Sequence, residues 1–163
     1  MNLPPIVQRA LWRAAGALAN RRPADIVIGG ATRPYMRRWW VIPRNRALNI
    51  YLHKFLRDDD DRALHDHPWV NCSILLQGSY REILPTRGGT LTTVIRHAGD
   101  VVFRGPRSAH RIELIDGEPC WTLFLTGPRL RSWGFWCQGA GWVHWRLFTS
   151  GPNGETVGKG CDQ

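Results

Sequence analysis

Apolar residues near the N-terminus recur with the period of an α-helix. Pro4 and Pro5 stand at the start of this pattern, where a first helical turn tolerates proline because its N–H groups have no partner within the helix. The pattern predicts one amphipathic helix that packs on the body of the protein and ends before Pro23. Its apolar positions are Ile6, Ala10, Leu11, Ala14, Ala17 and Leu18.

From residue 25 onward the pattern changes to short apolar runs separated by turn residues. Many positions in these runs are β-branched or aromatic, which is typical of β-strands. Closely spaced strands without a second helix predict an all-β sandwich or barrel. The runs cover residues 25–28, 39–42, 48–56, 70–76, 80–84, 91–96, 101–103, 110–115, 120–125 and 142–148.

The length of 163 residues fits a single domain. We expect an N-terminal helical arm over residues 1–24, a barrel over residues 25–149 and a flexible, Gly-rich tail over residues 150–163. A hydrophobic content of 43% excludes a disordered chain. The absence of any run of about 18 uncharged apolar residues excludes a membrane span.

The composition is basic and rich in tryptophan. The 22 Lys and Arg residues outnumber the 13 Asp and Glu residues, but they are spread along the chain and no RNA-recognition aromatic motif is present. Solvated arginines are therefore favoured over a nucleic-acid site, and the charge is consistent with an anionic ligand. The Trp-rich segment 133–145 is either a hydrophobic plug at one end of the barrel or a stacking platform for a base or sugar.

The cysteines and the N-terminal residues indicate the cellular compartment that we expect for the protein. The four cysteines are scattered without a Cys-x-x-Cys pair, which predicts reduced thiols in a cytoplasmic protein. Arg9 and Arg13 interrupt the apolar stretch at the N-terminus, which argues against an export signal.

The segment Leu64-His65-Asp66-His67-Pro68 carries the clearest chemical signal. In a strand, residues i and i+2 project from one face and lie about 6–7 Å apart at Cα, so His65 and His67 offer two imidazoles that one metal ion can bridge. Asp66 points the other way. The alternative is a pair of partly exposed surface histidines.

A second segment supplies a third histidine. Residues 99–110 read as a turn, a short strand, a loop constrained by Pro106 and a further strand that begins with His110. His65, His67 and His110 would form a facial set of neutral donors that suits Fe(II), Zn, Ni or Cu.

The two segments resemble the motifs of the cupin superfamily. Gly99 and His110 keep the spacing of its second motif, whereas Arg107 stands in place of an inner glycine. In the first motif the glutamate ligand is replaced by Asn71 or Cys72, depending on the number of intervening residues. The resemblance implies a double-stranded β-helix (jelly-roll barrel), a three-His metal site and, since cupins often pair through edge strands, a homodimer.

Residues 48–128 also resemble the cysteine dioxygenase branch of the cupins. The shared features are His65-Asp66-His67, Cys72, Leu76-Gln77-Gly78, Glu82 and His110-Arg111-Ile112-Glu113. In mammalian-type members the cysteine is cross-linked to a tyrosine on a later strand, where this chain has Phe124. The resemblance therefore implies a small-molecule oxygenase of the thiol-dioxygenase kind, with Fe(II) favoured and Zn or Ni as alternatives, rather than cysteine oxidation itself. The alternative is a non-catalytic metal- or ligand-binding cupin, such as a phage accessory protein, that recognises an anionic partner.

Other residues are candidates for roles around the metal. Glu82 is either a fourth ligand or a surface carboxylate paired with Arg81 or Arg96, and Tyr80 shares its face and could donate a proton. His53 lies in a cavity lining or in a packed core.

Two arginines flank the third histidine. Arg107 or Arg111 could hold a substrate carboxylate or phosphate in a bidentate fork, or pair with Asp66. We thus expect metal ligands His65, His67 and His110, catalytic residues Tyr80 and Arg111, and a small-molecule pocket with His53, Asn71, Cys72, Glu82 and Arg107.

Overall fold

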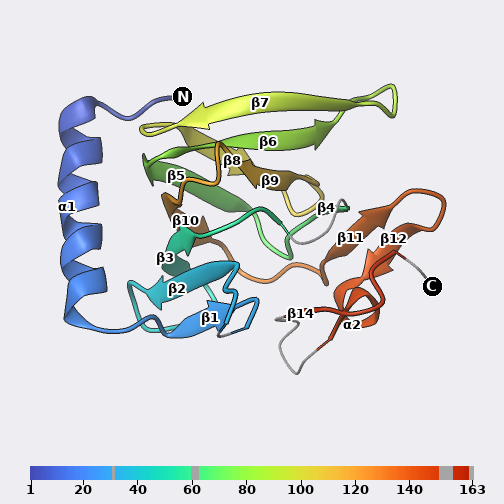
Figure 1. The fold of residues 1–163 in the computed structure, drawn as a ribbon, viewed down its shortest axis with the longest axis horizontal. Helices are drawn as coiled ribbons and strands as arrows, with labels where there is room; N and C mark the ends of the chain where they lie inside the picture. The colour runs from blue at the N-terminus through green and yellow to red at the C-terminus, as the bar shows by residue number, and fades with distance from the viewer. Residues whose placement is uncertain (31, 60–62, 151–155, 162–163) are drawn as a thin grey trace.

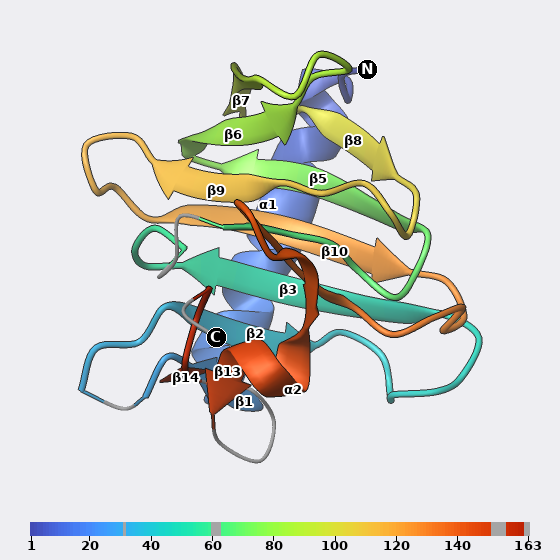
Figure 2. The ribbon, with the colours of Figure 1, turned by 90° about the vertical axis from the view of Figure 1, so that its right-hand side faces the viewer.

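The computed structural model describes residues 1–30, 32–59, 63–150 and 156–161. The predicted N-terminal helix is confirmed as α1 (Pro5–Arg21). Figure 1 shows α1 along one side of the molecule, and Figure 2 shows it behind the strands of the larger sheet. Ala15 packs there against Trp39, Leu52 and Leu76, because the apolar stripe of the helix covers the outer face of the sheet. No helix within the described residues is long and apolar enough to cross a membrane.

One antiparallel sheet forms the wall that α1 covers. Its strand order is β1-β2-β3-β10-β5-β8. The alternation along β10 points Thr122 and Phe124 toward the interior, because neighbouring residues of a strand face opposite sides. The bounds are β1 (Ile26–Ile28), β2 (Met36–Trp40), β3 (Asn49–Phe55), β5 (Asn71–Gln77), β8 (Val101–Arg104) and β10 (Cys120–Thr126).

The opposite wall consists of two three-stranded sheets that a single bridge joins. Their orders are β7-β6-β9 and β12-β11-β4, and the isolated antiparallel bridge between His65 and His110 connects β4 to the start of β9. The hydrophobic cluster that includes Met36, Tyr80 and Ile112 lies between this wall and the larger sheet. The bounds are β4 (Leu64–His65), β6 (Ser79–Pro85), β7 (Leu91–His97), β9 (Arg111–Leu114), β11 (Gly134–Cys137) and β12 (Gly141–His144). The predicted all-β jelly roll with one N-terminal helix is confirmed.

The C-terminal part differs from the sequence pattern in two respects. The apolar run 142–148 is not one strand, since β12 is followed by the short helix α2 (Trp145–Phe148). Within the segment predicted as a flexible tail, β14 (Thr156–Val157) pairs with β13 (Thr149–Ser150), whereas residues 151–155 and 162–163 lie outside the described part of the chain.

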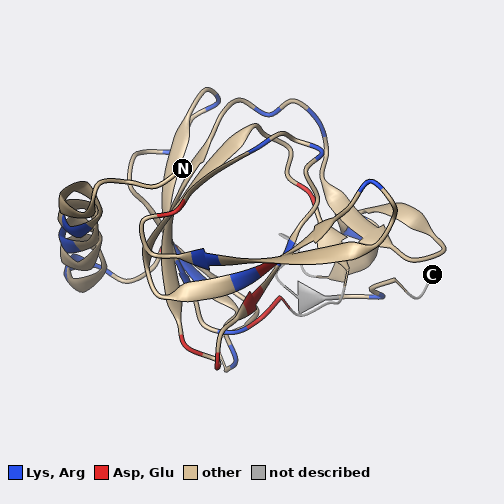
Figure 3. Ribbon diagram, turned by 90° about the horizontal axis from the view of Figure 1, so that it is seen from above, with Lys and Arg blue, Asp and Glu red and all other residues tan. Residues whose placement is uncertain are grey.

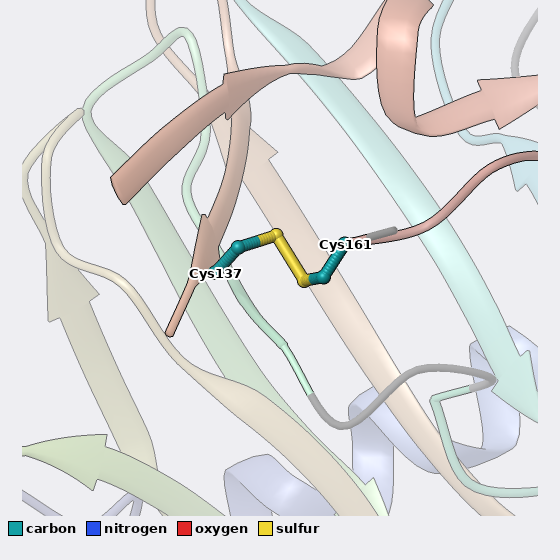
Figure 4. The surroundings of a disulfide bond; sticks show 2 residues. All are labelled: Cys137 and Cys161. Carbon is teal, nitrogen blue, oxygen red and sulfur yellow. A yellow bond between two sulfur atoms is a disulfide. The ribbon is translucent and has the colours of Figure 1, made fainter. Parts of the chain in front are cut away.

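A disulfide joins Cys137 in β11 to Cys161, as Figure 4 shows. The prediction of reduced thiols is therefore wrong for these two cysteines, while Cys72 and Cys120 are free. The spacing of the cysteines does not indicate this pair, because Cys137 lies on a strand and Cys161 on the C-terminal segment. The two meet only where the chain folds back on α2. Disulfides persist in oxidising compartments, so the cytoplasmic location that we predicted loses the support of its cysteine argument.

Charged residues are distributed over the whole molecule. Figure 3 shows Lys and Arg on α1, on strands and on loops, with Asp and Glu between them. This distribution agrees with the prediction that many of the basic residues are solvated surface arginines.

Candidate metal centre

His65, His67 and His110 converge on one point between the two walls. His65 ends β4 and His110 precedes β9, and their backbone bridge sets the rings side by side with centroids 4.7 Å apart. The ring of His67 lies 5.1 Å from that of His65 and 5.2 Å from that of His110. One nitrogen of each ring lies within 4.8 Å of the others. The three histidines that the sequence singles out are thus brought together, although His67 itself lies beyond the end of β4.

The chemistry of this donor set fits a divalent metal ion. Nε2 of His67 and Nε2 of His110 are 2.9 Å apart. Two nitrogens that bind one ion at about 2.1 Å and at a right angle would lie about 3.0 Å apart. Burial lowers the pKa of His67 well below its usual value and that of His110 to about 4, so both rings are neutral at pH 7 and have a lone pair to offer.

Carboxylates lie behind two of the three rings. Oε1 of Glu82 is 3.1 Å from Nδ1 of His110, and Oδ2 of Asp59 is 3.6 Å from Nδ1 of His65. A carboxylate that is hydrogen-bonded to Nδ1 retains the proton there and leaves Nε2 free to bind a metal, which is the usual arrangement of a metal-binding histidine. Glu82 can direct His110 in this way, whereas the 3.6 Å between Asp59 and His65 is too long for a hydrogen bond.

Glu82 is completely buried in an ion network rather than placed at the surface. Arg96 donates to Oε2 at 2.7 Å and Nε of Arg104 donates to Oε1 at 2.8 Å. Burial alone would raise the pKa of Glu82, but the hydrogen bond from His110 and the charge of Arg104 outweigh burial and lower it. The predicted pairing with Arg96 is present, whereas Arg104 was missed, because its neighbour Glu82 is 22 positions away and only the fold brings the two together.

Asp66 points away from the metal centre, as the strand alternation predicts, and ties it to the Trp-rich segment. Its completely buried carboxylate accepts hydrogen bonds from the backbone N–H of Gly134 at 2.9 Å and from Nε1 of Trp142 at 3.0 Å. Its arginine partner is Arg131, at 2.7 Å, and not the predicted Arg107 or Arg111. The chain between His65 and His67 is thereby fixed to the β11–β12 hairpin.

The three histidines line a cavity of about 570 Å³. Tyr80 and His53 also line this cavity, as does the buried guanidinium of Arg104. Asn71 is buried, Cys72 is half-buried and Arg107 is exposed, and none of the three is among the described residues that line it. Arg111 is likewise outside the lining and pairs with Glu113.

The Trp-rich segment forms part of the cavity wall. Trp133 stacks on Trp145 with centroids 5.8 Å apart, and Phe135 stacks on Phe148 at 3.6 Å. Trp133, Phe135 and Phe148 all line the cavity. The segment therefore contributes aromatic rings to this side of the cavity, an arrangement that fits both the hydrophobic plug and the stacking platform.

Sequence reasoning also missed Arg38 in β2. Its guanidinium lines the cavity, and its Nε donates to Nε2 of His53 at 2.8 Å. Since consecutive residues of a strand face opposite sides, only one arginine of the Arg37-Arg38 pair can point inward, and the alternation with the buried Met36 could have identified it.

No family model matches the sequence, and no curated protein matches it. Solved structures with a similar fold include the polyketide cyclase RemF from Streptomyces resistomycificus, at 17% identity over 65% of this chain and 72% of that chain, with a TM-score of 0.51. The iron(II) form of HppE in complex with substrate is 12% identical over 65% of this chain and 57% of that chain, with a TM-score of 0.52.

A cupin superfamily protein from Desulfitobacterium hafniense is also similar, at 13% identity over 57% of this chain and 77% of that chain, with a TM-score of 0.46. This chain thus spans little more than half the length of HppE and about three quarters of the cupin protein. At such identities the likeness shows the fold alone, and the predicted cupin jelly roll is confirmed.

Proposed function

We propose that this protein with a cupin fold is a metal-dependent oxygenase of small organic molecules, in which His65, His67 and His110 hold one divalent ion and Fe(II) is the native metal. The observation that carries the proposal is the convergence of three imidazoles at a cavity that is large enough for a substrate. HppE, which shares the fold, is an iron(II) protein that binds its substrate, and this supports the choice of iron.

Three protein nitrogens leave further coordination positions for other molecules, and a bound iron ion supplies Lewis acidity and a one-electron redox couple there. The protein contributes the surroundings. Glu82 directs the imidazole of His110, and Phe135 contributes an apolar ring to the wall beside the centre.

Tyr80 is the residue that we propose as a proton donor. It is buried in β6, lines the cavity and lies beside the guanidinium of Arg104. Burial raises the pKa of its phenol, with a further contribution from the charge of Glu82, so the hydroxyl group keeps its proton at neutral pH. Arg111, which the sequence suggested for substrate binding, pairs with Glu113 outside the cavity lining, so we assign it no role in the reaction.

The proposal is tested with protein that is purified without an affinity tag and loaded anaerobically with Fe(II). Nitric oxide serves as a stable substitute for O₂, so this measurement does not require knowledge of the substrate. We expect the EPR signal of a ferrous nitrosyl, followed by O₂ consumption with a thiol such as cysteamine or a diketone such as acetylacetone as probe. Retention of Zn or Ni with no nitrosyl signal after iron loading would instead favour the non-catalytic metal-binding cupin.

A further inference from the structure

Arg38 is a cation in the cavity of the three histidines, and it has no carboxylate partner among the described residues. It lies half-buried in β2, and its guanidinium carbon is 5.1 Å from the centre of the Tyr51 ring. Among the described residues no Asp or Glu oxygen lies within 4.0 Å of it, whereas the nearby Arg104 is neutralised by Glu82. A second cation, Arg44, lines the same cavity and adds to its positive potential.

His53 fixes the orientation of this guanidinium. The two residues are register partners on β2 and β3, and Nε of Arg38 donates to Nε2 of His53. Burial, together with the charge of Arg38, lowers the pKa of His53 well below its usual value, so its ring stays neutral and can accept this bond. The two terminal nitrogens of Arg38 have no partner among the described residues and are available for a bidentate contact with an anion.

The ring of Phe124 lies near both the His53 ring that holds this arginine and the His67 ring of the candidate metal centre. The ring of Phe124 lies 5.3 Å from that of His53 and 5.4 Å from that of His67. A planar group that lies against Phe124 can therefore reach from Arg38 to the histidines. Further rings line the same cavity, including Tyr51 and Trp69.

The size of the cavity indicates the size of the ligand. Pockets of about 300–1,000 Å³ hold drug-sized ligands, and about 570 Å³ is far more than a small amino acid fills. Aromatic walls favour a flat, apolar body, and the two terminal nitrogens of Arg38 match the two oxygens of one carboxylate.

We propose that the substrate is an aromatic carboxylic acid whose carboxylate binds Arg38 and whose ring lies against Phe124, with its far end at the histidine centre. The proposal rests on the proposed function for the identity of the substrate, but binding of the acid to Arg38 does not require the metal. His53 acts as a positioning residue for Arg38.

Calorimetric titration with benzoate, 2-naphthoate and 4-phenylbenzoate, each compared with its neutral carboxamide, tests the proposal. We expect at least one acid to bind about tenfold more tightly than its amide, and the change Arg38→Met to remove that preference. Arg37→Met is the matched control, because Arg37 is the exposed neighbour on the same strand, and it should bind like the parent. Binding of no acid by the parent, equal binding of acids and amides, or undiminished binding by Arg38→Met would overturn the proposal.

Two further measurements separate this proposal from the metal site. Arg38→Lys keeps the charge and should retain part of the preference, and the metal content of both Arg38 variants reports whether they fold. The change His110→Ala should remove the metal while the acid still binds. Acid binding in a protein that takes up no iron would contradict the proposed oxygenase alone, whereas a parent that takes up iron and forms the nitrosyl but prefers no acid would contradict this proposal alone.

Discussion

His65 and His110 exchange both of their backbone hydrogen bonds, each at 2.9 Å. In an antiparallel bridge the two side chains project from the same face, so this pair of bonds sets the two imidazoles next to each other. The same bonds join the two three-stranded sheets of one wall. The candidate metal centre therefore lies at the bridge that joins the two sheets of this wall, and a bound ion would add a further link across it.

The first prediction concerns metal content. The changes His65→Ala and His110→Ala each remove one of three donor nitrogens, and we expect the bound metal to fall from roughly one ion per chain to a small fraction of that. Elemental analysis of protein without an affinity tag measures it. His97→Ala is the control, since His97 is exposed on β7 and should leave the metal content unchanged. Equal metal in the parent and in both site variants would contradict the site.

The second prediction concerns Glu82, which keeps His110 oriented and neutralises Arg104. The change Glu82→Gln leaves the buried guanidinium of Arg104 without its counter-charge, so we expect a loss of about 3 kcal/mol in the free energy of unfolding. Because the hydrogen bond to Nδ1 of His110 also weakens, metal affinity should fall about 10- to 100-fold. Chemical denaturation and competition with a chelator measure the two effects.

Glu113→Gln is the matched control for Glu82. Glu113 pairs with Arg111 at the partly exposed face of β9, where the loss of an ion pair costs about 1 kcal/mol or less. Its metal affinity should equal that of the parent. If the Glu82 variant also kept the affinity of the parent, Glu82 would serve only as the counter-charge that Arg96 and Arg104 share.

Short-range patterns explain how much of the site could be predicted. The spacing of His65 and His67, and the turn before His110, are local features, so the cluster of three histidines was predicted from the sequence. The hydrogen bond from His110 to Glu82 was not predicted, because Glu82 reaches this ring only through the register between β6 and β9.

Arg38 illustrates the limit of motif reasoning. It lies outside both histidine motifs. Its proposed role follows from the lack of a carboxylate partner among the described residues, which only the folded structure shows. The disulfide is a similar case, since Cys137 and Cys161 become neighbours only where the chain folds back on α2. Most strand runs were located well, but the run 39–42 shares only two residues with β2, and β4, β11, β13 and β14 were not among the predicted runs.

The third prediction concerns the bond between Cys137 and Cys161. It closes a loop of 24 residues, so its reduction should lower the free energy of unfolding by about 3 kcal/mol. Gly158 and Gly160 donate to the carbonyl of Phe148, so the released segment should also loosen this cavity-lining residue. Denaturation with and without reductant measures the effect on stability.

The double change Cys137→Ser and Cys161→Ser is the control for reduction, because its stability should not respond to reductant. Thiol titration gives an independent check. The unreduced, denatured parent should show two thiols, from Cys72 and the buried Cys120. Four thiols before reduction would show that the disulfide does not form.

The fourth prediction concerns the pH dependence of stability and follows from His53. Burial and the charge of Arg38 hold the pKa of His53 well below its usual value of 6.5 in the folded protein. As the pH falls below 6.5, the unfolded chain takes up a proton at His53 and the folded protein does not, so folding loses stability toward acid. The contribution of this one group is fully present above pH 6.5 and decreases by up to about 1.4 kcal/mol per pH unit below it.

In metal-free protein, His53→Gln removes this proton uptake while its side-chain oxygen can still accept from Arg38. The variant should therefore show a shallower loss of stability between pH 6.5 and 5.5 than the parent, measured by denaturation at each pH. His97→Gln, at an exposed position, should keep the slope of the parent, and a His53→Gln slope equal to that of the parent would show that His53 takes up its proton equally well in the folded protein.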